Sequence, residues 1–244
     1  MAARFVSLSF LAHDPLLLAR FWSAALRWEI AVADDDTVEL APTDDTGFPI
    51  RFVRSAVPKL GQNRVHFDLT TTSFDDQRDT VEQLISLGGR HIDIGQGPDD
   101  THVVLADPEG NELCIIEPTN NFLATCPRLG AVNCDGTQAL GYFWHHALEW
   151  PLVWDRGEES AIRDPSRRGP FFTWSGPPLM PKLTENRMRF EVAPSADGNQ
   201  SIELDRLLQL GATQLGHGPD GALTLADPDV NAFRLRAEAP PISG

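Results

Sequence analysis

The stretch Leu105-Ala106-Asp107-Pro108-Glu109-Gly110-Asn111 returns as Leu225-Ala226-Asp227-Pro228-Asp229-Val230-Asn231, an offset of 120 residues (227 − 107). A second pair of stretches, Lys59–Phe67 and Lys182–Phe190, shares the pattern Lys-Leu-x-x-Asn-Arg-x-x-Phe. A repeat of this length indicates a duplicated domain rather than a solenoid. We therefore predict a first domain at residues 1–119, a linker at 120–127 and a second domain at 128–244.

Local patterns predict a strand, a helix and three more strands, and this order occurs twice in each half. The first strand covers residues 5–11, where Val6, Leu8 and Phe10 alternate with polar residues. Asp14-Pro15 then has the residue types that begin a helix. The turn at 107–110 has glycine in its fourth position, and we expect the copy with Val230 there to use a different turn.

Composition restricts the classes of function. The chain has 244 residues with 41% hydrophobic and 23% charged residues, as is usual for globular proteins. The net charge of −15 disfavours nucleic acid and anionic membranes as partners. Three cysteines without metal-binding spacing indicate free thiols and a cytoplasmic protein. We also find no apolar run long enough for a membrane helix.

The runs Lys59–Leu69 and Asp107–Cys114, set in paired strand–helix–three-strand modules, resemble the vicinal oxygen chelate superfamily. This is the glyoxalase/bleomycin resistance/dioxygenase family. The resemblance implies an α+β fold of two tandem domains. Each domain would consist of paired modules that form a curled sheet with the helices outside.

The resemblance also implies where a metal would bind, on the cleft face of the first and last strands of the modules. In the first half these positions fall on Ser7, on Arg51 or Val53, on His66 and on Cys114. Only His66 is an ordinary ligand, although Cys114 could bind as a thiolate. The second half has Arg189 and Arg234 at the positions of His66 and Cys114. Because a catalytic site needs about three ligands, we predict no metal and no other cofactor.

His66 and Asp68 share one face of their strand, so Asp68 could orient His66 as a general base. The alternative is a histidine that only lines the cleft. Arg189 and Arg234 could hold a carboxylate or phosphate between them in the second cleft. Alternatively, Glu191 pairs with one of these arginines. Trp174 could stack on a planar ligand, or could be a core aromatic residue.

These observations favour a cytoplasmic, metal-independent protein that binds a small organic molecule. Its acidity would suit a cationic ligand. The alternative function is a glyoxalase-like lyase or isomerase that uses His66 and Asp68 at an unusual site. A third interpretation is a structural or regulatory dimerisation module. Formation of a homodimer stays open.

Overall fold

A computed structural model describes residues 2–97, 100–218 and 220–237. The described residues form four modules, each with one helix. Module 1 consists of β1 (Arg4–Ala12), α1 (Pro15–Leu26), β2 (Glu29–Ala33), β3 (Thr37–Ala41) and β4 (Ile50–Arg54). Module 2 consists of β5 (Val65–Leu69), α2 (Phe74–Ser86), β6 (Arg90–His91), β7 (Val103–Ala106) and β8 (Glu112–Ile115). Module 3 consists of β9 (Leu129–Cys134), α3 (Gln138–Leu148), β10 (Leu152–Arg156), β11 (Glu159–Ile162) and β12 (Phe171–Trp174). Module 4 consists of β13 (Met188–Ala193), α4 (Gln200–Gln209), β14 (Thr213–His217), β15 (Leu223–Ala226) and β16 (Ala232–Leu235).

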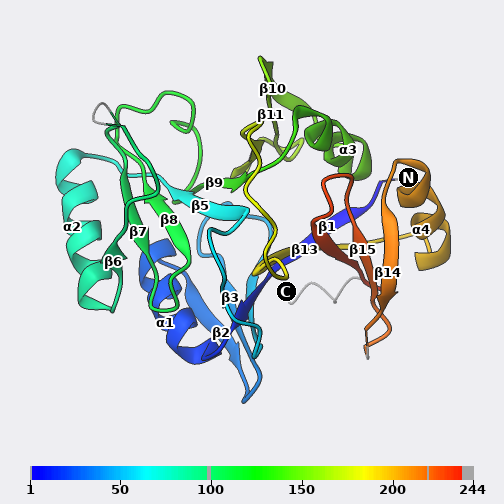
Figure 1. Ribbon diagram of the computed structural model, residues 1–244, viewed down its shortest axis with the longest axis horizontal. Helices are drawn as coiled ribbons and strands as arrows, with labels where there is room; N and C mark the ends of the chain where they lie inside the picture. The colour runs from blue at the N-terminus through cyan, green and yellow to red at the C-terminus, as the bar shows by residue number, and fades with distance from the viewer. Residues whose placement is uncertain (1, 98–99, 219, 238–244) are drawn as a thin grey trace.

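The modules pair across the two halves of the chain. Sheet A has the strand order β14-β15-β16-β13-β1-β4-β3-β2, so it combines modules 1 and 4. Sheet B has the order β10-β11-β12-β9-β5-β8-β7-β6, so it combines modules 2 and 3. The central pairs, β1 with β13 and β5 with β9, are antiparallel. Figure 1 shows β1 and β13 running through the middle of the molecule.

This pairing confirms the α+β class and the curled sheets but changes which residues share a cleft. We expected Ser7 and Arg51 beside His66 and Cys114. Instead, Ser7 and Arg51 lie in sheet A with Arg189 and Arg234. The reason is that the β1–β13 and β5–β9 pairs join opposite halves. The domain limits 1–119 and 128–244 stay a prediction, and their outer ends, residues 1 and 238–244, lie outside the described residues.

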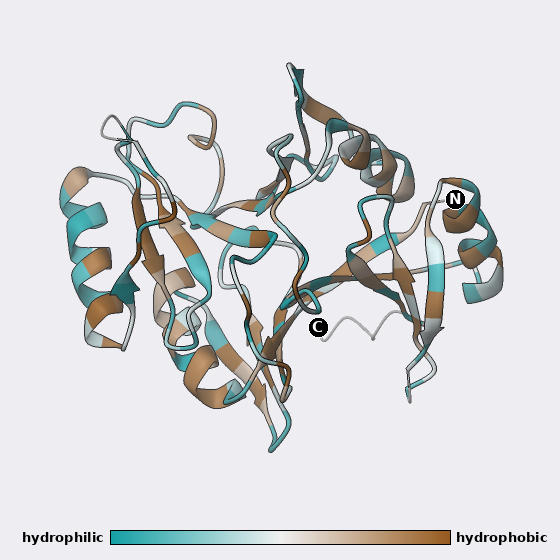
Figure 2. Ribbon diagram, viewed as in Figure 1, coloured by the Kyte–Doolittle hydropathy of each residue, from teal (hydrophilic) through white to brown (hydrophobic). Residues whose placement is uncertain are grey.

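One hydrophobic core fills the space behind both clefts. Leu8 and Phe10 of β1 and Phe67 of β5 are fully buried there, as predicted. Val6 is only half-buried, because a β-bulge between Phe5 and Ser7 breaks the alternation, and Phe5 packs against the core instead. In Figure 2, α1 is largely hydrophobic, whereas α2 mixes both colours. No helix in the described ranges is long and apolar enough to cross a membrane.

The repeated turn ties neighbouring modules together. Asp107 accepts a hydrogen bond from the indole of Trp22 in module 1, and Asp227 is bonded in the same way to Trp144. Asp107 and Asn111 also close their own turn. The copy with Val230 makes the same backbone bonds as the copy with Gly110, so our expectation of a different turn is wrong. The surrounding hydrogen bonds hold Val230 at a φ of 60°.

Candidate functional site

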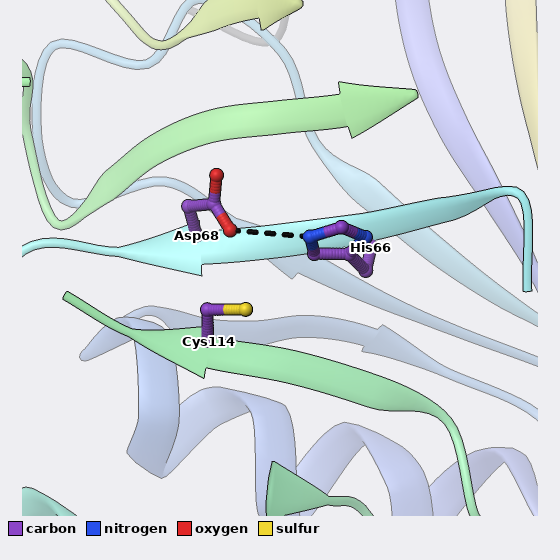
Figure 3. A group of neighbouring side chains, drawn as sticks. All are labelled: His66, Asp68 and Cys114. Carbon is purple, nitrogen blue, oxygen red and sulfur yellow. Dashed lines mark ion pairs between the residues drawn. The ribbon is translucent and has the colours of Figure 1, made fainter. Parts of the chain in front are cut away.

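The cleft face of sheet B presents three side chains that can carry chemistry. His66 and Asp68 point to the same side of β5, and Cys114 rises beside them from β8 (Figure 3). Nε2 of His66 lies 3.3 Å from Oδ1 of Asp68. One ligand atom from each residue lies within 4.8 Å of the others. The three therefore form a compact cluster, which we call the His66 cluster.

Contacts and burial within the cluster shift the pKa values of His66 and Cys114. Burial alone would lower the pKa of His66, but Asp68 and Cys114 outweigh burial and raise that pKa well above 6.5. Burial raises the pKa of the Cys114 thiol above 9.0, against the effect of His66. The contacts thus favour the charged form of His66, and burial favours the uncharged form of the Cys114 thiol.

A cavity of about 320 Å³ opens next to the cluster. Asp68 lines it together with Asn133 of β9 and Thr173 of β12, whereas His66 is not among the lining residues. The amide of Asn133 donates to Asp68 at 3.2 Å. The hydroxyl of Thr173 is buried and has no hydrogen-bond partner among the described residues. A buried polar atom without a partner is unusual unless a water or ligand satisfies it.

The predicted linker forms one wall of this cavity. Leu123 is buried against the cleft face of sheet B with Cys114, Ala131 and Phe171. Phe122 lines the cavity and packs edge-on against Trp154 of β10, with ring centroids 5.6 Å apart. The segment at residues 120–127 therefore covers part of the cleft as well as joining the two halves.

Trp174 is among the residues that line the cavity, but it is almost completely buried. Its side chain is 1% exposed and belongs to the main core, next to Thr173, which also lines the cavity. Of the two interpretations of Trp174, a core aromatic residue therefore describes it better than a residue that stacks on a ligand. Its indole ring leaves Gly136 and Gly141 no room for a side chain.

The centre of the cleft of sheet A is already occupied by a buried side chain. Glu191 of β13 is 1% exposed and lies 3.1 Å from Arg236, 3.7 Å from Arg234 and 3.9 Å from Arg51. Ser7 and Ser9 donate hydrogen bonds to the same carboxylate. Glu191 therefore pairs with Arg234, as our alternative had it, whereas Arg189 pairs with Glu185 at 2.8 Å.

The distances within the His66 cluster would allow it to hold a metal ion. One nitrogen, one carboxylate and one sulfur form a mixed donor set of the kind that zinc accepts. Our sequence argument counted only His66 and Cys114 and missed Asp68 as a third donor. The cleft-facing residues of β9 and β12 nearest the cluster are Asn133 and Thr173, which add no ionisable ligand. All three donors thus come from one module.

The sequence analysis did not single out Asn133 and Thr173, which lie in the half opposite to His66. Strand parity alone could have found them, since Asn133 alternates with buried Val132 and Cys134. Strand parity could not predict that β5 pairs with β9, and this pairing brings Asn133 opposite His66.

Comparison with known proteins agrees with this architecture. A family model described as a glyoxalase-like domain matches residues 6–116 and again residues 131–236. The chain belongs to this family. A search of curated proteins found no match.

Solved structures show the same fold. The glyoxalase-like chain is 14% identical to glyoxalase I from Zea mays, covering 98% of this chain and 93% of that one with a TM-score of 0.62. It is 13% identical to a protein named as a dioxygenase candidate from Bacillus subtilis subsp. subtilis str. 168, covering 97% and 85% with a TM-score of 0.62. At these identities the likeness establishes the fold alone.

Proposed function

We propose that this glyoxalase-like protein binds a small organic molecule in the cleft of sheet B. The observation that carries the proposal is the cavity of about 320 Å³, in which Asp68, Asn133 and Thr173 converge opposite Phe122 and Trp154. A few convergent polar groups within an apolar wall are typical of ligand sites. The unpartnered hydroxyl of Thr173 supports the proposal, because a ligand would satisfy it.

Charge narrows the class of ligand. Asp68 and Glu159 both line the cavity, and no Lys or Arg is among the described residues that line it. An anion would therefore be repelled, and a neutral or cationic molecule with a planar apolar body fits best. Phe122 and Trp154 would contact that body.

The test uses three probes of similar size, benzylamine, benzyl alcohol and benzoate, in titration calorimetry of the Arg189→Gln variant, which removes a cation from the other cleft. We expect benzylamine to bind most tightly and benzoate least tightly. Asp68→Asn should weaken benzylamine binding by about 1.5–3 kcal/mol, the range for hydrogen bonds to charged groups. Glu185→Gln, which changes a carboxylate at the other sheet, is the matched control and should have no effect. Benzoate binding that equals or exceeds benzylamine binding would refute the proposed ligand class.

We further propose that this binding needs no metal. The three donors come from one module, and Asn133 and Thr173 of the facing module are not ionisable. The one facing carboxylate that lines the cavity, Glu159 of β11, accepts a hydrogen bond from the indole of Trp154. If a metal were bound, His66, Asp68 and Cys114 would hold it, and it would act as a Lewis acid toward a ligand oxygen. Elemental analysis of the purified protein decides the matter. About one zinc, nickel, iron or manganese per chain, lost in His66→Ala, would overturn the metal-free proposal.

The alternative function, a lyase or isomerase, is favoured by one observation, the ion pair of His66 and Asp68 at the edge of the cavity. Because Asp68 faces the cavity, Asp68 would take the substrate proton and His66 would hold Asp68 in place. This reverses the roles that we expected from the sequence. The test is exchange of carbon-bound hydrogen in hydroxyacetone dissolved in D2O, followed by NMR. Exchange that Asp68→Asn abolishes supports an enzyme, and no exchange above the buffer rate contradicts it.

A cytoplasmic location is proposed on the three cysteines, none of which forms a disulfide within the described residues. A homodimer stays a prediction that sedimentation can check.

A further inference from the structure

A second cavity, of about 500 Å³, lies on the cleft face of sheet A. Its floor consists of Arg189 of β13, Thr224 of β15 and Ala232 of β16. The segment at residues 182–185 forms one wall, and Leu215 and His217 of β14 form another. This cavity lies beside the buried Glu191 network and shares none of its side chains.

The charge of this cavity is opposite to that of the protein as a whole. Lys182 and Arg189 contribute two positive charges and Glu185 contributes one negative charge, so the net charge is +1 with His217 neutral. The whole chain has a net charge of −15. A local positive site in such an acidic protein fits a ligand with a single negative charge.

Arg189 is only partly satisfied by the protein. Its Nη2 donates to Glu185 at 2.8 Å, while its Nε is buried and has no hydrogen-bond partner among the described residues. The Arg189 side chain is 16% exposed and the Glu185 side chain is 59% exposed, so the carboxylate is the partner that water already reaches and that a competing anion can approach. A ligand carboxylate can therefore replace Glu185 on the guanidinium, since arginine binds carboxylates through two parallel N–H groups.

Apolar side chains flank the charged groups. Leu183 is 60% exposed and Leu215 is 58% exposed, although both line the cavity. Large apolar side chains that stay open around a polar centre mark a binding surface for an apolar group. An inorganic anion would leave them uncovered, whereas an organic anion would bury them.

We propose that the cleft of sheet A contains a second binding site, for a small organic carboxylate, with Arg189 and Lys182 holding its charge and Leu183 and Leu215 covering its apolar body. Lys182 thus takes the role that the sequence analysis gave to Arg234, which is committed to Glu191 and Asp220. Lys182 donates one hydrogen bond to the backbone carbonyl of Val230, which leaves its other two donors for a ligand. This site differs in ligand charge from the one proposed in sheet B.

The experiment measures binding of phenylacetate, phenylacetamide and inorganic phosphate by titration calorimetry. Phenylacetamide has the same body without the charge, and phosphate has the charge without the body. We expect phenylacetate to bind at least tenfold more tightly than either. Arg189→Gln should weaken phenylacetate binding tenfold or more, whereas Glu185→Gln should strengthen it because the competing carboxylate is removed. Asp68→Asn, in the other cleft, is the control and should leave phenylacetate binding unchanged.

The two variants with opposite expected effects keep the test independent of folding defects, since a damaged fold would not tighten binding in Glu185→Gln. Arg189→Lys serves as a second variant, with binding between that of the parent and Arg189→Gln. No measurable phenylacetate binding at millimolar concentration would overturn the proposal. Equal binding of phenylacetamide would overturn the role of charge. Preferred binding of phosphate would overturn the organic carboxylate as the ligand class. Loss of phenylacetate binding in Asp68→Asn would assign the ligand to sheet B and overturn the site.

Discussion

Val230 holds a backbone conformation that is unfavourable for a β-branched residue. Its φ is 60°, at the position where the first copy of the turn has Gly110 with a φ of 88°. The two turns close with the same hydrogen bonds, from residue 110 to Asp107 and from residue 230 to Asp227. The bonds of the turn thus outweigh the preference of its fourth residue.

We therefore predict that Val230→Gly stabilises the protein by about 1 kcal/mol, since glycine adopts positive φ without steric strain. Val230 is exposed, so little packing is lost. Chemical denaturation measures the change in the free energy of unfolding. The matched control, Gly110→Val, should lower stability by a similar amount or more. A Val230→Gly variant less stable than the parent would show that the strain is absent.

Asp107 makes stability depend on pH. Burial raises the pKa of Asp107 from 3.8 to about 6, against the hydrogen bonds from Asn111 and Trp22. A carboxyl whose pKa is raised on folding stabilises the folded state when protonated, and this contribution is lost as the pH rises through 6. Relative to Asp107→Asn, the parent should lose about 1.4 kcal/mol of stability between pH 5 and pH 8. Denaturation of both proteins at several pH values tests this. A free energy of unfolding of the parent that stays constant or rises with pH, relative to that of Asp107→Asn, would contradict it.

At the scale of single residues, the sequence predicted which side chains belong to the candidate site better than it predicted which side chains surround them in space. Strand parity placed His66 and Asp68 on one face, and the family resemblance singled out Cys114 on the strand that the structure shows as β8. Parity failed at Val6, because a β-bulge adds one residue without any marker in the sequence. Phe5, half-buried rather than exposed, is the side chain that packs into the core.

Among the elements, the linker at residues 120–127 has the role that the sequence did not reveal. The linker was predicted there because residues 120–127 lie between the two repeated halves, and Phe122-Leu123 within it was the available sign of packing. The sign could not be interpreted, because the cleft that these side chains cover is formed by strands from both halves.

We predict that Leu123→Ala lowers the free energy of unfolding by about 2–5 kcal/mol, the usual cost of removing a buried leucine side chain. Leu60→Ala, in an exposed loop of the first half, is the control and should change stability by no more than about 0.5 kcal/mol. Thermal or chemical denaturation compares the two variants. Equal small effects would mean that the linker does not pack on sheet B in solution.

For the whole molecule, the repeat predicted two similar halves and the family resemblance predicted the curled sheets. Neither could predict that each sheet takes one module from each half, because strands β1, β5, β9 and β13 have interchangeable apolar faces. The choice depends on long-range packing, such as that of Phe5 against Phe190 and Phe172.

This pairing predicts the behaviour of a divided chain. If residues 1–127 and 128–244 are produced together as separate chains, they should purify as one complex, since β1 pairs with β13 and β5 with β9. Affinity purification through a tag on one fragment tests this. Two fragments that separate and are each monomeric and folded would mean that each half can close its own sheet.

The exchange of modules has a consequence for how this protein could change its ligands. All of sheet B lies in one uninterrupted segment, Val65–Trp174, whereas sheet A is assembled from the two ends of the chain. The chain can thus be regarded as one continuous insert enclosed by a second, split unit. Exchanging a complete half between related proteins would disturb both clefts at once. Grafting the insert alone would transfer one cleft with its complete set of strands, so this segment, and not the half-chain, is the unit in which binding specificity can be inherited.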